Sequence, residues 1–263
     1  MAPSLHKLVD VNQSAFIPGR AITDNILLSE ELMRGYTRAH GSPRCALKVD
    51  IQKAINGENK WYFMGQRGLR QEDPMSPYLF TLIMEVFNLM IKRRIQQSPN
   101  HKYHWRCVKQ KLTHLCFADD LLIFNHGSIQ AVQVVKDTLQ EFQAVSGLIP
   151  NPHKSSIFYG KINAGLKAQI SNIMGFVEEK LPVRYLGIPL VGTRMLVKDC
   201  NILVEQVKAR IQNSKHRALS FAGRLQLINS MLQSLQVYWC SSENATDEIA
   251  WQSYDAQWSK DHR

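Results

Sequence analysis

The sequence has few cysteines and no long apolar run. Its 263 residues include five cysteines, and this odd, scattered set excludes a disulfide framework and indicates a reducing compartment. No apolar run approaches the length of a membrane span, and the N-terminus lacks the apolar core of a signal peptide. We therefore expect an intracellular protein, nuclear or cytoplasmic, with no membrane partner.

Acidic residues are absent between Glu85 and Asp119. The basic residues in this interval are Lys92, Arg93, Arg94, Lys102, Arg106, Lys109 and Lys111. With a formal net charge of +10 for the whole chain, the interval favours a polyanionic partner, of which nucleic acid is the commonest. A solvated basic face without a function is the alternative.

Carboxylates stand out at two places. Asp119 and Asp120 interrupt the apolar segment 112–124, which we interpret as a buried β-hairpin with both aspartates at its tip. Asp50 lies at the end of a predicted strand over 45–51. Because buried carboxylates are paired, hydrogen-bonded or metal-bound, these residues suggest two-metal phosphoryl transfer with Mg²⁺. Turn chemistry also explains the Asp-Asp pair, and Asp50 also fits an ordinary strand end.

Hydrophobic spacing predicts three helices in the first part of the chain, over 21–38, from Tyr78 to about Gln96, and from Ile129 to a stop at Gly147. We expect Ser76 to be the N-cap of the second helix and Pro77 to be its first residue. This helix is apolar nearly all round, so we expect it in the core.

The second part of the chain changes character along its length. We expect a short strand over 156–159 and a hairpin or paired strands over 181–191. From Val197 to Tyr238 the pattern is helical and basic, which marks the best domain boundary. We assign no role to residues 239–263, and the sequence does not indicate an oligomeric state.

Seven blocks, in the same order, resemble the reverse transcriptase of LINE-type (non-LTR) retrotransposons, especially the group abundant in plants. The blocks are NQSAFIPGR (12–20), LKVDIQKA (47–54), GLRQEDPMSPYLF (68–80), FADD (117–120), SGL with Asn151 and KS (146–155), YLGIPL (185–190) and LSFAGRLQLINS (219–230). One such block is a weak signal, whereas an ordered series covering about residues 7 to 238 is specific.

The resemblance implies an α+β fold of the right-hand polymerase type. It places partial fingers at 1–45, a palm of antiparallel sheet and helices at 46–192, and a helical thumb at 193–238. It also implies an RNA-directed DNA polymerase whose partners are an RNA template, a DNA primer and deoxynucleoside triphosphates. The expected cofactor is Mg²⁺, with two ions.

Matching motif by motif, the resemblance implies a role for each candidate residue. Asp50 and Asp119 become catalytic metal ligands, and Asp120 an auxiliary one. The other matches are Lys154 for pyrophosphate departure, Arg20 and Gln71 for nucleotide binding, and Tyr185, Leu186 and Gly187 for the primer end.

The chain departs from the family pattern in two places. After the strand with Asp50, the family has an aromatic residue, a second aspartate and a longer stretch, whereas Ala54 runs directly into Ile55 here. This indicates an internal deletion. Glu72 replaces a glycine where backbone approaches a triphosphate. We also expect the chain to start after most of the fingers and after the upstream endonuclease. These departures predict a decayed copy with weak or absent polymerase activity.

Two alternatives remain open at this point. A non-catalytic RNA- or DNA-binding remnant would use the basic interval and the thumb without chemistry. A zinc cluster is the other, although its spacing matches no standard finger. Its candidate ligands are His101, His104, Cys107, His114 and Cys116.

Overall fold

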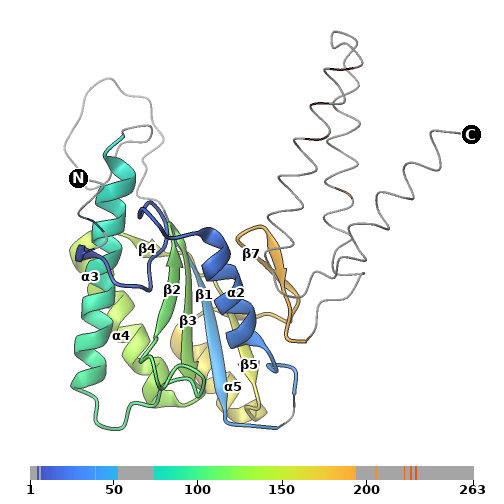
Figure 1. The fold of residues 1–263 in the computed structure, drawn as a ribbon. Coiled ribbons are helices and arrows are strands. Elements are labelled where there is room, and N and C mark those ends of the chain that lie inside the picture. The colour runs from blue at the N-terminus through green and yellow to red at the C-terminus, as the bar shows by residue number, and fades with distance from the viewer. Residues whose placement is uncertain are drawn as a thin grey trace, which may run out of the picture.

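The computed structural model describes residues 5, 7–38, 40–52, 74–193, 205, 222, 226 and 229. Within them, a six-stranded sheet has the order β2-β3-β1-β5-β6, and β4 pairs with the end of β1 (Figure 1). Its strands are β1 (Arg44–Gln52), β2 (His114–Phe117), β3 (Asp120–His126), β4 (Ile149–Pro150), β5 (Ser156–Gly160) and β6 (Val177–Glu178). All pairs are antiparallel except β5 with β6, which is parallel. The α+β prediction is confirmed, and the sheet is mixed rather than wholly antiparallel.

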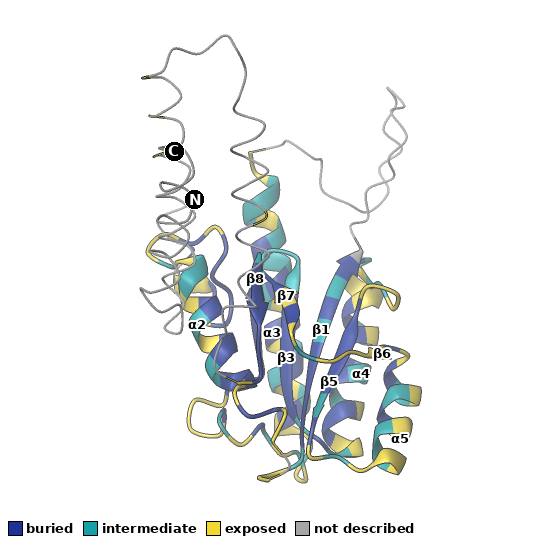
Figure 2. Cartoon of the chain, turned by 90° about the vertical axis from the view of Figure 1, so that its right-hand side faces the viewer, coloured by how far each residue is buried: buried dark blue, intermediate teal, exposed yellow. Residues whose placement is uncertain are grey.

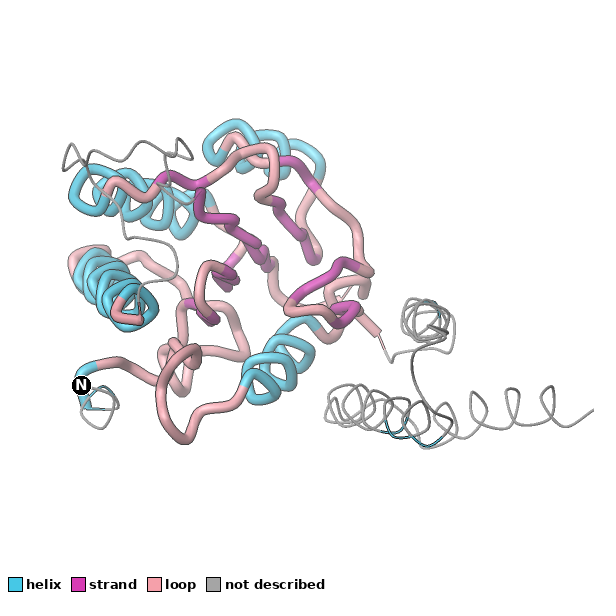
Figure 3. The backbone as a smooth tube through the Cα atoms, turned by 90° about the horizontal axis from the view of Figure 1, so that it is seen from above, coloured by secondary structure: helices cyan, strands magenta, loops and turns pink. Residues whose placement is uncertain are grey.

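Helices cover the two faces of this sheet unequally. One face packs against α3 (Ser76–Gln96), α4 (Ile129–Ser146) and α5 (Ala164–Met174). The other face carries α2 (Ile22–Met33) and a separate two-stranded sheet, β7 (Val183–Tyr185) with β8 (Ile188–Leu190). Seen from above, the sheet lies between these two layers (Figure 3).

Strand β1 separates two hydrophobic cores because its side chains alternate between the faces. Cys45, Leu47, Val49 and Ile51 belong to the core under α3, α4 and α5. Ala46 belongs to the core shared with α2, β7 and β8. Figure 2 shows the central strands as the most buried part of the chain. The strand predicted over 45–51 is confirmed, and it extends by one residue at each end.

The helix ends agree with the sequence where a capping residue is present. Helix α4 begins after Ser128, whose Oγ accepts from the Ala131 backbone N–H, and ends at Gly147 with φ 75°, as predicted. Helix α2 ends at Met33, so the predicted end at Arg38 is wrong. The chain turns there because Gly35 is left-handed (φ 88°) and its N–H donates to the carbonyl of Gly192, at 2.7 Å.

Helix α3 corrects further expectations, and helix α5 was not expected. The N-cap of α3 is Met75, so Ser76 is the first helical residue rather than the cap, and Pro77 is the second rather than the first. Only part of α3 is buried in the core, because the apolar side chains of Leu79, Val86 and Leu89 are exposed. The sequence reasoning missed α5, although Asn163 caps it and a left-handed glycine ends it.

Several expectations lie outside the described residues. These are the deletion after Ala54, Gln71, Glu72, nearly all of the predicted thumb and residues 239–263. In the part of the chain that the structure describes, no helix is long and apolar enough to cross a membrane.

Candidate active site at the end of the central strand

Asp50 and Asp120 face each other across the pair β1–β3. The backbone N–H of Asp50 donates to Ser155 Oγ at 3.1 Å, and its carbonyl accepts from the Asn151 N–H at 2.8 Å. Both backbone groups thus point away from β3, which makes Asp50–Asp120 a non-hydrogen-bonded pair. Such pairs have the closest Cα atoms, about 4.5 Å apart, with both side chains on one face.

Asp119 lies in a strained turn next to Asp120. Phe117 pairs with Asp120, so Ala118 and Asp119 form a two-residue turn, and Asp120 is the first residue of β3 rather than part of the tip. Ala118 has φ 53°, a conformation normally taken by glycine at the first position of a type II′ turn. The thiol of Cys116 donates to the Ala118 carbonyl at 3.2 Å. Left-handed alanine costs about 1–2 kcal/mol, so the surrounding strands must hold the turn.

The charges of the cluster act on one another. Burial raises the pKa of the Asp120 carboxyl, the Lys48 ammonium lowers it, and the carboxylates of Asp119 and Asp50 raise it. Like charges close together disfavour ionisation unless a cation joins them. This arrangement therefore concentrates negative charge at the C-terminal end of β1 and favours the binding of a cation there.

The donor set fits a hard divalent cation in its chemistry. Carboxylate oxygens are the ligands that Mg²⁺ prefers. Nevertheless, among the residues that the structure describes, no group of three or more His, Cys, Asp or Glu side chains is arranged to hold a metal ion. Mg²⁺ is usually bound through one or two carboxylates plus substrate phosphates rather than by an all-protein cage, so a carboxylate pair that substrate completes meets this requirement.

The predicted nucleotide-side residues differ in what the structure shows of them. The Arg20 guanidinium donates to the backbone carbonyls of Asp10 and Gln13, and to that of Val9 at 2.8 Å. It therefore anchors the N-terminal loop in this structure. Lys154 is exposed in the loop before β5.

Sequence reasoning missed a buried polar network that supports the turn. Cys116 on β2 donates its N–H to the carbonyl of Asn12 at 2.8 Å and accepts from the N–H of Ser14 at 3.1 Å. The Asn25 side-chain amide also donates to the Cys116 carbonyl, at 3.0 Å. The signal was present as the polar run Asn12-Gln13-Ser14, which is buried. This network fixes the edge strand next to Asp119.

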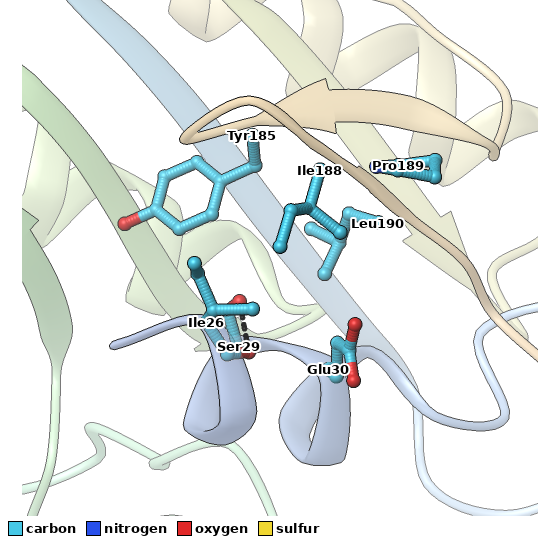
Figure 4. A pocket seen from close by; sticks show the side chains of 7 residues that line it. All are labelled: Ile26, Ser29, Glu30, Tyr185, Ile188, Pro189 and Leu190. Atoms are coloured by element: carbon cyan, nitrogen blue, oxygen red, sulfur yellow. Dashed lines mark hydrogen bonds between the residues drawn. The ribbon is translucent and has the colours of Figure 1, made fainter. Parts of the chain in front are cut away.

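The predicted primer-end residues form the turn of the hairpin β7–β8. Leu186 and Gly187 both have positive φ, 48° and 88°, which is the type I′ pattern. Tyr185 is buried, and Figure 4 shows its ring beside Ile26 with the hydroxyl pointing away from Glu30. Burial raises the pKa of Tyr185, and the nearby Cys116 and Asp120 raise it further. The turn thus lies on the same face as the carboxylates.

Ion pairs within the protein use much of the basic interval. Lys92 pairs with Asp10, and Arg93 and Arg94 pair with Glu141. Arg106 pairs with Glu31, likewise within the protein. Lys102, Lys109 and Lys111 make no ion pair with another described residue. The interval is therefore less available to a polyanion than its sequence suggests.

The zinc alternative is wrong for the described residues. His114 contacts Phe87 edge-on, on the side of the sheet under α3. His104 stacks on Tyr36 and lies against Phe124, on the opposite side. The candidate ligands are thus divided between two faces of the sheet, and no metal-holding group is found among them.

Comparison with known proteins agrees with this geometry. The family model for reverse transcriptase (RNA-dependent DNA polymerase) matches residues 1–190. The Transposon TX1 uncharacterized 149 kDa protein of Xenopus laevis is 23% identical over 273 residues, which cover 88% of this chain and 20% of that protein. An uncharacterized mitochondrial protein of Arabidopsis thaliana is 39% identical over 66 residues, which cover 25% of this chain and 54% of that protein. The chain thus spans about a fifth and about half of these relatives. The chain belongs to the reverse transcriptase family.

Proposed function

We propose that this chain is a fragment of a non-LTR retrotransposon reverse transcriptase that retains one two-metal site for nucleotidyl transfer and turns over slowly. The observation that carries the proposal is the register of β1 against β3. It sets Asp50 opposite Asp120, with Asp119 in the adjoining turn. Two carboxylates from distant parts of the sequence thus face each other at one end of the sheet, and the third belongs to the neighbouring residue of the chain.

The chain's own residues would share the work as follows. Asp50 and Asp119 would hold two Mg²⁺ ions, with Asp120 as an auxiliary ligand; when bound, these ions activate the primer hydroxyl and stabilise the leaving pyrophosphate. Ser155 and Asn151 hold the Asp50 backbone in place. The turn at Leu186 and Gly187 would support the primer end.

Three further residues would act on the nucleotide side. The exposed ammonium of Lys154 would donate a proton to the departing pyrophosphate, a role that suits a solvent-facing general acid. Gln71 would lie beside the incoming nucleotide, and Arg20 would act there through the loop that it anchors.

Slow turnover follows from the two sequence departures. The deletion after Ala54 removes a piece of the palm's helical support, together with the aromatic residue that would screen the 2′ position of the nucleotide. Glu72 sets an anion beside the triphosphate, and like charges there oppose nucleotide binding. We retain the division into fingers at 1–45, palm at 46–192 and thumb at 193–238.

Primer extension on poly(A) annealed to oligo(dT), with Mg²⁺ and thymidine triphosphate, tests the proposal. We expect slow extension by the wild-type chain and none by Asp119→Asn. Asp137→Asn, a substitution on the far side of the sheet, is the matched control and keeps the wild-type rate. Efficient synthesis would contradict slow turnover. Nucleic-acid binding without any extension, unchanged in Asp119→Asn, would favour the non-catalytic remnant.

A further inference from the structure

Lys48 occupies a distinctive place on the central strand. It precedes Asp50 by two residues, so the two side chains share a face of β1. In register it lies between Leu122 of β3 and Ser156 of β5. Its ammonium reaches out of the sheet and donates to the backbone carbonyl of Arg184 on β7, at 2.9 Å.

This hydrogen bond connects two separate sheets. The hairpin β7–β8 pairs only with itself among the described strands. Apolar contacts of Val183, Tyr185 and Leu190 hold it on the carboxylate face of the main sheet. Apolar burial is non-directional, so it favours contact but sets the height and slide of the hairpin weakly. The hydrogen bond from Gly35 to Gly192 ties the chain just after β8, and a charged donor aimed at the Arg184 carbonyl adds direction at β7.

The surroundings of Lys48 contain both basic and acidic side chains. A cavity of about 530 Å³ lies beside Lys48, and its charged or titratable lining consists of Lys154, Arg184, His153, Glu178 and Glu179. Of the two acids, Glu178 pairs with Lys167. Lys48 also interacts electrostatically with Asp120, since its positive charge lowers the pKa of that carboxyl. Lys48 therefore lies between the carboxylate cluster and the hairpin.

We propose that Lys48 is a positioning residue that fixes the hairpin β7–β8 over the carboxylates, and so fixes where a primer 3′ end lies. The inference rests on the proposed function for its primer, whereas the tether itself is a property of the free protein. Arg184 is adjacent to Tyr185 and two residues before the Leu186–Gly187 turn. A shift at Arg184 therefore moves the turn that would support the primer.

Hydrogen exchange of the protein without substrate tests the tether. We compare Lys48→Met, which removes the donor, with Lys48→Arg, which keeps one of similar reach. The matched control is Lys136→Met, because Lys136 also donates to a backbone carbonyl, that of Met174 at 3.4 Å, on the helical side of the sheet. In Lys48→Met we expect roughly tenfold faster exchange at the amides of 183–190. Lys48→Arg and Lys136→Met should exchange there as the wild type does.

Single-turnover primer extension tests the consequence. Because small misplacements of reacting groups cost up to about 10²-fold in rate, Lys48→Met should extend roughly ten- to a hundredfold more slowly. Its dissociation constant for primer–template should stay within about threefold of the wild type, because positioning rather than affinity is lost. Lys48→Arg should recover most of the rate.

Each result decides the matter. If Lys48→Met matches Lys136→Met in both measurements, the tether is overturned and the proposed function is untouched. If rate and affinity fall together, Lys48 is a general contact to the nucleic acid and the positioning role is overturned. If the wild-type chain extends no primer, the proposed function fails, and the exchange at 183–190 alone decides whether Lys48 is a tether.

Discussion

Over residues 47–50 the two faces of β1 carry different kinds of side chain, although they belong to one strand. Towards α3 and α4, Leu47 and Val49 are almost fully buried, with 0% and 1% of their surface exposed. Towards β7–β8, Lys48 and Asp50 are half-buried and charged. The alternation of a strand thus places the stabilising core and the candidate chemistry back to back. Substitutions on one face should change stability, and those on the other should change function.

The largest expected effect belongs to the charged face. Replacing Asp50 by Asn removes a metal ligand, so primer extension should fall by roughly 10³-fold or more. Thermal stability should hold or rise, because a like-charge contact with Asp120 is relieved. Extension assays and calorimetry on the same preparation check this. A retained rate would show that Asp50 is an ordinary strand-end residue.

The opposite face should respond in the opposite way. Leu47→Ala removes a side chain with 0% exposure and should lower the free energy of unfolding by about 2–5 kcal/mol. Denaturant unfolding measures this. At denaturant concentrations below its unfolding midpoint, the folded fraction of Leu47→Ala should extend primer at the wild-type rate. Loss of extension without loss of stability would break the division between the faces.

Acid should destabilise the folded protein through two buried histidines, one on each side of the sheet. Burial lowers the pKa of His104 to about 4 and that of His114 to about 3, below the usual 6.5. Between pH 6.5 and about 4 the unfolded chain therefore binds protons that the folded chain does not. Stability should fall with decreasing pH, by about 1.4 kcal/mol per pH unit for each histidine.

Histidine substitutions separate the two contributions. His104→Phe keeps the ring contact with Tyr36 and removes one proton acceptor, so its stability should depend less on pH between 6.5 and about 4. Urea midpoints measured across this range check the prediction. An unchanged pH slope would mean that His104 is not buried in its neutral form.

The smallest expected effect concerns the strained turn. Ala118 has φ 53°, so Ala118→Gly should relieve strain and raise stability by about 0.5–1 kcal/mol after the entropy cost of glycine. The reciprocal control is Gly147→Ala, where φ is 75°, and it should lower stability by about 1 kcal/mol. If both substitutions raised the free energy of unfolding, or both lowered it, the assigned turn geometry would be contradicted.

The local elements were predictable because their signals are local. Strand β1 follows from its apolar run, and α4 follows from its apolar spacing and its stop at Gly147. The hairpin around Asp119 was predicted from an apolar segment with a polar tip. Its closing residue was misplaced by one position, since Asp120 belongs to β3.

The parts that sequence reasoning missed depend on distant residues. The end of α2 is marked by the left-handed Gly35, a local signal that was passed over, and is held by a hydrogen bond from Gly35 to Gly192, which no local pattern reveals. The basic interval looked unpaired because its acids, Asp10 and Glu141, lie far away in the sequence. The contact of Lys48 with Arg184 spans 136 positions. Contacts between segments that lie far apart in the sequence, rather than composition, decide these features.

The most direct test of the central claim counts metal ions in the assembled complex. Mn²⁺ binding is measured by electron paramagnetic resonance with primer–template and a non-hydrolysable nucleotide present. If Asp50, Asp119 and Asp120 form one site, the wild-type chain should bind about two ions, and both Asp50→Asn and Asp119→Asn should lose at least one of them. Two ions retained in both variants would contradict a shared two-metal site.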